Sequence, residues 1–290
     1  MGGAEPPAVA TRVWRCGVHT LFLDHPLVMG IVNVTPDSFS DGGRFAEPLS
    51  AVERGRTLAA AGADIIDVGG ESTRPGSDAV PVPLELSRVQ PVISALVHGL
   101  DIPISVDTRH PEVAAAALRD GASIVNDVSG FRDPTMVELA AGCDAGLVVM
   151  HMLGEPKSMQ DEPHYDDVVA EVCDYLARQA AMLEASGVAR ERIALDPGIG
   201  FGKTTAHNLE LLRRLHEVAA LGYPVVIGLS RKRFIGEVTG EVRPDRRVAG
   251  SVAGAVFSAL HGGDVIRVHD VAETVQALTV ITAIQEAGRD

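Results

Sequence analysis

The sequence is poor in aromatic and in basic residues. Phe, Trp and Tyr make up 4% of its 290 residues, a content that argues against an aromatic-rich binding surface. Lys and Arg number 25 against 39 Asp and Glu, so the formal net charge is −14. This charge excludes sequence-independent binding to nucleic acid or to an anionic membrane surface, because both require a basic surface. An anionic substrate would therefore need a local cationic pocket.

Cysteines and long apolar runs are also scarce. Cys16, Cys143 and Cys173 are widely spaced and form no C-x-x-C pair, so zinc and redox chemistry are not indicated. No apolar segment follows Arg12 and Arg15, and no run reaches the roughly 18 apolar residues of a membrane span. We therefore expect a cytoplasmic protein with neither a targeting signal nor a membrane segment.

The sequence does contain short apolar runs, each followed by a stretch with helical periodicity. The eight runs span 27–34, 63–70, 102–108, 122–130, 145–152, 192–200, 224–232 and 265–271. Helices are predicted over 49–62, 111–121, 168–187 and 273–288, and several end at Gly. This alternation predicts an α/β fold, a single-domain (β/α)8 barrel. An open doubly wound sheet is the alternative, but no G-x-G-x-x-G follows the first strand.

We expect residues 27–290 to form the barrel and residues 1–26 to form an N-terminal extension that caps it. In such barrels the active site lies at the C-terminal ends of the strands. Polar residues stand at all of these ends: Asn33, Asp67, Glu71, Asp107, Asn126, Asp127, His151, Asp196, Ser230, Arg231, Lys232, Arg267 and His269. Each one alone is explained equally well as a cap of the following helix. Their presence at every strand end indicates a common pocket.

Several of these side chains match a flat heterocycle. Asp107, Asn126 and Asp196 offer acceptors, and a ring with a 2-amino group beside a ring N–H would pair with a carboxylate through two parallel hydrogen bonds. Pterin and guanine rings both fit this description. Lys232 could donate to the oxo group and to the ring nitrogens. We interpret His151, on an apolar strand, as a hydrogen-bonded core residue.

A second group of side chains indicates an anion site. Asn33 lies on the first strand, and Arg267 and His269 lie on the last, which is its neighbour in a closed barrel. Thr73 and Arg74 would complete the site. The amide oxygen of Asn33 is a hard ligand that suits Mg²⁺ bound to a diphosphate.

The motifs together resemble one family. GIVNVTPDSFSDGG (30–43), ESTRPG (71–76), SVDT (105–108), VNDVSG (125–130), VVMHM (148–152), LDPGIGFGKT (195–204), GLSRKRFIG (228–236) and RVHDV (267–271) occur in the order seen in dihydropteroate synthases. The match runs over all eight strands, from about residue 27 to 271. This coverage is far more specific than a single glycine motif.

The resemblance implies a transferase of folate biosynthesis. Its reaction joins 7,8-dihydropterin-6-ylmethyl diphosphate to p-aminobenzoate and gives 7,8-dihydropteroate and diphosphate. The resemblance further implies Mg²⁺ as cofactor, a Mg²⁺-assisted dissociative substitution, inhibition by sulfonamides, and a homodimer that pairs through its outer helices. The two small-molecule substrates would be its main partners.

The resemblance also implies roles for individual residues. The pterin would be held by Asp107, Asn126, Asp196, Lys232 and Arg267, and the diphosphate by Asn33, Thr73, Arg74, Arg267 and His269, with Asn33 also binding Mg²⁺. The p-aminobenzoate site would comprise Phe39, Thr73, Arg74, Pro75 and Lys232, and the catalytic residues would be Asp37, Lys232, Arg267 and His269. The loop TPDSFSDGG would close over the second substrate, and its Asp37 would orient the amine or accept its proton.

One position departs from the family pattern, and two other functions compete. Arg233 stands where the family often has Ser, so its contact with the p-aminobenzoate carboxylate is an open question. Pterin-binding methyltransferases that use corrinoid partners share the contacts at Asp107, Asn126 and Asp196 but need no diphosphate site. A catalytically silent pterin-binding paralogue is the other alternative. The synthase is favoured by the loop at 35–43, by STRPG, and by Arg267 with His269.

Overall fold

The computed structural model describes residues 12–35, 46–72, 79–154 and 159–287. Its main sheet contains β3 (Leu27–Asn33), β4 (Ile65–Gly69), β5 (Ile104–Asp107), β6 (Ile124–Asp127), β7 (Gly146–Met150), β8 (Ile193–Asp196), β9 (Val226–Gly228) and β10 (Val265–Val268). These strands are all parallel and follow the order β8-β7-β6-β5-β4-β3-β10-β9. A parallel bridge between Leu195 and Val225 joins the two outer strands. The predicted α/β barrel is therefore confirmed, and the alternative of an open sheet is wrong.

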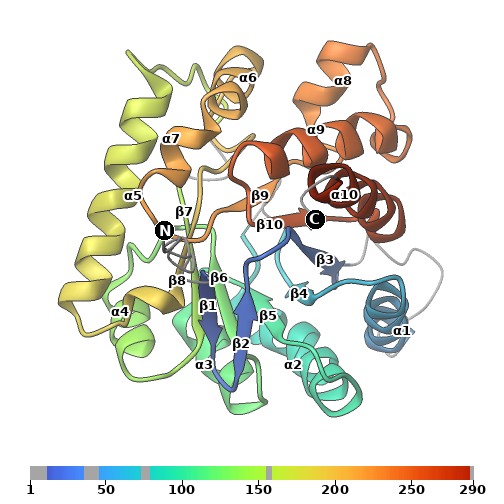
Figure 1. Ribbon diagram of the computed structural model, residues 1–290. Helices are drawn as coiled ribbons and strands as arrows, with labels where there is room; N and C mark the ends of the chain where they lie inside the picture. Colours follow the sequence, from blue (N-terminus) through green and yellow to red (C-terminus); the bar gives the residue numbers. More distant parts are fainter. Residues whose placement is uncertain (1–11, 36–45, 73–78, 155–158, 288–290) are drawn as a thin grey trace, which may run out of the picture.

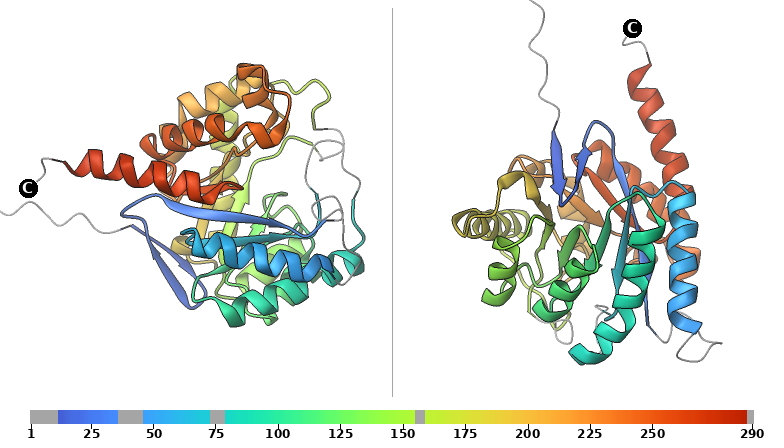
Figure 2. Two further views of the ribbon diagram at one scale, coloured as in Figure 1. Left: turned by 90° about the vertical axis from the view of Figure 1, so that its right-hand side faces the viewer. Right: turned by 90° about the horizontal axis from the view of Figure 1, so that it is seen from below.

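Helices surround the strands, as Figures 1 and 2 show. They are α1 (Ala46–Ala60), α2 (Val82–Gly99), α3 (Pro111–Arg119), α4 (Pro134–Ala141), α5 (Val168–Ala185), α6 (Thr205–Arg213), α7 (Leu215–Ala219), α8 (Arg233–Thr239), α9 (Val248–Leu260) and α10 (Val271–Glu286), with short 3-10 turns at Arg190–Arg192 and Pro244–Arg246. The four helices predicted from the sequence correspond to α1, α3, α5 and α10. Over the described ranges, none of the helices has the length and apolar character that a membrane crossing requires.

The interior of the barrel contains an apolar layer near the N-terminal ends of the strands. Its members form one cluster with Trp14: Leu27, Met29, Ile65, Ile124, Val148, Ala194, Val226 and Val265. Trp14 belongs to β1 (Val13–Cys16), which pairs antiparallel with β2 (His19–Phe22). The indole N–H donates to the carbonyl of Arg192 at 2.9 Å, and the side chain is fully buried. This hairpin lies at the end of the barrel that we call the barrel bottom.

The two-residue alternation of side chains along each strand places a polar layer above the apolar one. Successive side chains of a strand point to opposite faces, so residues two apart share a face. Asp67 follows Ile65 by two positions, and the same relation links Asn126 to Ile124, Asp196 to Ala194 and Arg267 to Val265. The polar layer thus lies inside the barrel at the C-terminal strand ends, where a ligand can enter.

Candidate active site

Arg267 is the centre of the polar layer. Its Nε donates to Asp67 Oδ2 at 2.6 Å, and its Nη2 donates to Asp107 Oδ2 at 2.6 Å. Asn126 Nδ2 donates to the same Asp67 oxygen at 3.2 Å. The structure therefore joins side chains of β4, β5, β6 and β10. Asp107, Asn126 and Arg267 are predicted site residues, whereas Asp67, which joins Asn126 to Arg267, is predicted only as a strand-end residue.

Two carboxylate oxygens of this layer have no hydrogen-bond partner among the described residues. Asp67 Oδ1 and Asp107 Oδ1 are buried, and neither has a hydrogen bond within the described part of the chain. Burial raises the pKa of Asp107 from 3.8 to about 7, against the opposing effect of Arg267. An unpaired buried acceptor costs free energy unless a ligand supplies a donor. Asp107 is thus suited to receive N–H groups of a bound ring.

Asp196 and Lys232 form the opposite side of the layer. Asp196 Oδ1 accepts from the backbone N–H of Gly198 at 2.7 Å. Burial raises the pKa of Asp196, and it lowers the pKa of Lys232 to about 8, while the charge of each group stabilises that of the other. The Lys232 amine donates to the Ile199 carbonyl and lies 4.5 Å from the centre of the Phe201 ring. A cation and an acceptor therefore face the same space.

Lys203 is a further buried residue of this region and is not among the site residues predicted from the sequence. Its amine donates to the carbonyls of Gly198 and Phe201, both at 3.0 Å, and lies 2.9 Å from His151 Nδ1. Burial lowers the pKa of Lys203 to about 7 and that of His151 far below its ordinary value, which leaves His151 as a neutral acceptor. Lys203 therefore fixes the glycine-rich segment after β8. Its position in the motif LDPGIGFGKT is the only feature of the sequence that indicates this role.

The close packing of this segment requires glycine at one position. Gly198 has a φ of +67°, and a Cβ there would lie 1.9 Å from the carbonyl oxygen of His151. No other residue fits without moving the backbone. The segment after β8 is thereby held against the end of β7, next to Asp196.

The predicted anion site is present in part. Asn33 ends β3, which pairs with β10, the strand of Arg267. His269 follows β10, and both its backbone N–H and its Nδ1 lie 3.2 Å from Ser230 Oγ. Asn33 and His269 are half-buried. They stand at the same end of the barrel as Arg267, as the sequence predicts.

Five predicted site residues lie outside the described residues: Asp37, Phe39, Thr73, Arg74 and Pro75. Arg233 is described, and it begins α8. Its side chain is 83% exposed and pairs with Glu237 at 2.5 Å. In the structure the Arg233 side chain thus lies in solvent and pairs within its own helix.

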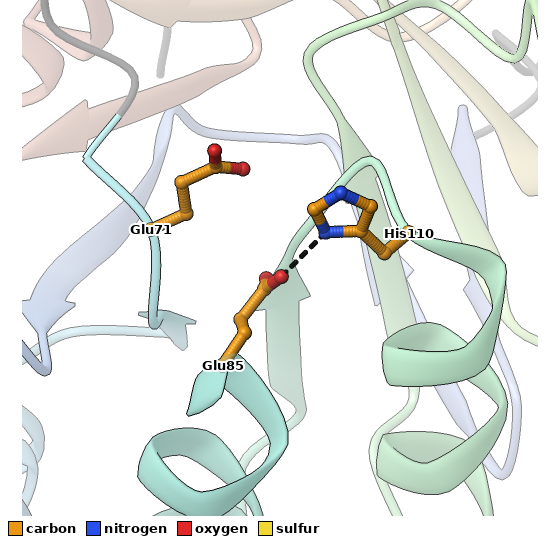
Figure 3. Close-up of side chains that lie close together, drawn as sticks. All are labelled: Glu71, Glu85 and His110. Carbon is orange, nitrogen blue, oxygen red and sulfur yellow. Dashed lines mark hydrogen bonds and ion pairs between the residues drawn. The ribbon is translucent and has the colours of Figure 1, made fainter. Parts of the chain in front are cut away.

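Glu71, Glu85 and His110 lie close together near the ends of β4 and β5, as Figure 3 shows. Their ligand atoms lie within 4.8 Å of one another, the only such group of metal-ligating type found among the described residues. Each carboxylate already has a basic partner, because His110 Nδ1 is 2.6 Å from Glu85 and Arg109 Nη2 is 3.1 Å from Glu71. Glu71 also accepts from the Val80 backbone N–H at 3.1 Å. We interpret the group as a network of hydrogen bonds and ion pairs that holds the segments after β4 and β5 against the start of α2.

The fold and this polar layer define a barrel enzyme that binds a flat, donor-bearing ring. In agreement, the family model for pterin-binding enzymes matches residues 29–269. The dihydropteroate synthase of Escherichia coli K12 is 48% identical over 268 residues, which cover 92% of this chain and 95% of the relative. The chain therefore belongs to the dihydropteroate synthase family and is a transferase. This result decides against the corrinoid-linked methyltransferases.

Solved structures agree with this assignment. Dihydropteroate synthase of Xanthomonas albilineans with 4-aminobenzoic acid has a TM-score of 0.91 and 51% identity, covering 95% of this chain and 99% of its own. The Burkholderia cenocepacia enzyme complexed with 7,8-dihydropteroate has a TM-score of 0.88, 44% identity, and coverage of 96% and 98%. The Yersinia pestis enzyme with a sulfonamide drug has a TM-score of 0.89, 42% identity, and coverage of 95% and 99%.

Proposed function

We propose that this chain joins 7,8-dihydropterin-6-ylmethyl diphosphate to p-aminobenzoate in folate biosynthesis, releasing diphosphate. The observation that carries the proposal is the buried polar layer, in which unpaired carboxylate oxygens lie beside a guanidinium and a lysine amine. The relatives solved with 4-aminobenzoic acid and with 7,8-dihydropteroate support both halves of the reaction. Formation of labelled dihydropteroate from labelled p-aminobenzoate, with Mg²⁺ and the pterin diphosphate, tests it directly.

The pterin ring would enter the polar layer. The 2-amino group and the adjacent ring N–H would donate to Asp107, whose Oδ1 is buried without a partner among the described residues, or to the buried carboxylate of Asp196. Asn126 supplies both a donor and an acceptor. Lys232 would donate to the oxo group, and Arg267 would lie against the ring.

The diphosphate would bind where β3 and β10 meet. Arg267 uses Nε and Nη2 for Asp67 and Asp107, which leaves Nη1 for a phosphate oxygen. Asn33, His269, Thr73 and Arg74 would complete this site. The Asn33 amide oxygen also fits Mg²⁺, which commonly takes one or two protein ligands and fills its other positions with water and substrate phosphates. When bound, Mg²⁺ would neutralise charge on the diphosphate.

The residues support a substitution in which the C–O bond breaks first. The electron-rich dihydropterin stabilises a cation at its methylene carbon, and the bond's electron pair leaves with the diphosphate. Arg267 and His269 would stabilise the charge that develops on that leaving group. The weakly basic arylamine then attacks the cation, and Asp37 would orient the nitrogen or accept its proton. The protein needs to supply no nucleophile of its own.

A dissociative route predicts exchange without the second substrate. If the C–O bond ionises before the amine attacks, the oxygen between the methylene carbon and the α-phosphorus should exchange position with the non-bridging oxygens of that same α-phosphate in isotope-labelled pterin diphosphate. This scrambling should occur with enzyme and Mg²⁺ in the absence of p-aminobenzoate. Positional isotope exchange followed by ³¹P NMR measures it. A preparation that forms product but scrambles no label would count against ionisation as a separate first step.

The p-aminobenzoate site would use Phe39, Thr73, Arg74, Pro75 and Lys232. Of these, Lys232 lies among the described residues, and its amine lies over the Phe201 ring. The loop at 35–43 would close over the bound arylamine. Exclusion of water by this closure would protect the cation from hydrolysis.

Sulfonamides are expected to inhibit competitively with p-aminobenzoate. Their aniline ring and acidic sulfonyl group copy the arylamine and the carboxylate, and the Yersinia pestis relative was solved with such a drug. The Arg233 side chain is exposed and paired with Glu237 on its own helix. Initial rates with sulfamethoxazole at several p-aminobenzoate concentrations measure the pattern. Noncompetitive inhibition in active enzyme would show that the second substrate binds elsewhere.

We further propose a cytoplasmic homodimer. Cys16, Cys143 and Cys173 are all free thiols, which is usual in a reducing compartment. The neighbouring outer helices α9 and α10 carry exposed apolar side chains, with Leu260 45% and Ile284 64% exposed. Exposed apolar surface of this kind favours a protein contact.

For the domain organisation, we propose that residues 27–290 form the pterin-binding barrel and that residues 1–26 form an extension that caps it. The burial of Trp14 in the apolar layer supports the capping role. The span of the family model, residues 29–269, supports the boundary of the barrel.

A further inference from the structure

Lys232 follows a turn with unusual backbone geometry. The Lys232 N–H donates to the Leu229 carbonyl at 3.2 Å, so Ser230 and Arg231 are the central residues of the turn. Arg231 has a φ of +59°, a left-handed conformation that is costly for residues with a Cβ and that Gly or Asn usually takes in turns. Its presence beside a substrate-binding lysine needs an interaction that offsets this cost.

The Arg231 side chain makes such an interaction. Its Nε donates to Asp270 Oδ2 at 3.0 Å, and its Nη2 contacts the other oxygen of the same carboxylate. The side chain of Asp270 is 8% exposed and that of Arg231 is 31% exposed, so the pair is partly buried. Paired N–H donors on one carboxylate are geometrically specific. This bidentate pair connects the segment after β9 to Asp270, which follows His269 and directly precedes α10.

The backbone of Arg231 is anchored as well. Its N–H donates to Ser251 Oγ at 2.9 Å, and its carbonyl accepts from Arg247 Nη1 at 3.1 Å. Both partners belong to the start of α9, whose first residue is Val248. Side chain and backbone together therefore hold Arg231 from two helices.

The direction of Lys232 depends on this turn. Its side chain crosses the segment after β8 so closely that a Cβ at Gly200 would lie 3.1 Å from Lys232 Cδ. The amine ends at the Ile199 carbonyl, over the Phe201 ring. A small rotation of the turn would move the amine out of the polar layer.

We propose that the Arg231–Asp270 ion pair is a positioning pair, which holds the left-handed turn that aims the Lys232 amine into the polar layer. The inference rests on the proposed role of Lys232 in binding the pterin. Arg231 and Asp270 act through Lys232 and need no contact with substrate.

The test compares Arg231→Gln, Arg231→Gly, Asp270→Asn and Lys232→Met. Arg231→Gln keeps the strained φ but loses the charge, so we expect pterin affinity and kcat/KM to fall at least about tenfold, since small misplacements of a binding group are costly. Asp270→Asn should behave alike. Arg231→Gly also loses the pair but adopts a positive φ freely, so it should retain more affinity than Arg231→Gln. Calorimetric titration with 6-hydroxymethylpterin and steady-state kinetics measure both quantities.

A double-mutant comparison separates positioning from general destabilisation. If Arg231 acts through Lys232, adding Arg231→Gln to Lys232→Met should change kcat/KM by less than about twofold. The matched control is Arg12→Gln. Arg12 lies at the barrel bottom, and its two terminal nitrogens donate to the two carboxylate oxygens of Asp264 at 2.8 and 3.0 Å. This variant should lower thermal stability and leave pterin affinity unchanged.

Three outcomes would overturn the inference. Wild-type affinity in folded Arg231→Gln and Asp270→Asn, together with impaired Lys232→Met, would refute the positioning pair and spare the proposed role of Lys232. Fully additive effects of Arg231→Gln and Lys232→Met on kcat/KM would also refute the positioning pair and spare the role of Lys232. Wild-type affinity in Lys232→Met would instead refute that role of Lys232, and the inference with it.

Discussion

Replacing Arg267 by Ala is expected to lower kcat by about 10²–10³-fold, the usual cost of removing one preorganised donor from a developing negative charge. The residue would serve the departing diphosphate through Nη1, while Nε and Nη2 stay on Asp67 and Asp107. Loss of the guanidinium also leaves two buried carboxylates without their cation. Breaking a buried pair in this way costs roughly 3–5 kcal/mol of stability. Steady-state kinetics and urea unfolding measure the two effects separately.

Two further variants show whether the loss belongs to the site. Arg267→Lys keeps the charge but cannot bridge two carboxylates as a planar fork, so it should recover stability in part and activity little. Arg192→Lys is the matched control, because Arg192 is also buried and its Nε donates to the Ala145 carbonyl at 2.9 Å, near the barrel bottom. It should destabilise the protein and leave kcat unchanged. Near-normal kcat in Arg267→Ala would refute its proposed role in the departure of the diphosphate.

Replacing Asp107 or Asp196 by Ala is expected to weaken pterin binding by about 1–3 kcal/mol, because the ring's N–H donors would be buried without acceptors. Each carboxylate is buried in the free protein and has a raised pKa. A ring that donates hydrogen bonds needs the ionised form. Calorimetric titration of both variants with a pterin measures the loss, and unchanged affinity would refute the assignment.

The pH dependence distinguishes the two carboxylates. The pKa of Asp107 is raised to about 7, so the group takes up a proton as the pH falls through that value. Pterin affinity of the wild type should therefore fall as the pH drops below about 7 and hold between that value and about 8, the pKa of Lys232. Asp196→Ala should keep this dependence near neutral pH, whereas Asp107→Ala should lose it.

The polar layer was predictable because it follows from the period of the strands. Asn126 and Asp196 each stand two residues beyond an apolar interior residue, and a parallel barrel brings such positions to one end. The pairing of Arg267 with Asp67 was not predictable, since the two are 200 residues apart and meet across the barrel interior. The role of Lys203 was not predictable for a different reason. Apart from His151, its partners are backbone carbonyls, whose directions depend on glycine conformations that the sequence pattern does not encode.

Trp14 is the only tryptophan of the chain, and this has a spectroscopic consequence. The indole is fully buried, bonded to the Arg192 carbonyl and packed in the apolar layer. Its emission therefore reports on the end of the barrel that lies opposite the polar layer. Unfolding exposes this fluorophore to water, whereas a substitution among the strand-end residues leaves its surroundings intact. The protein thus carries an intrinsic optical signal that separates loss of the fold from loss of ligand binding.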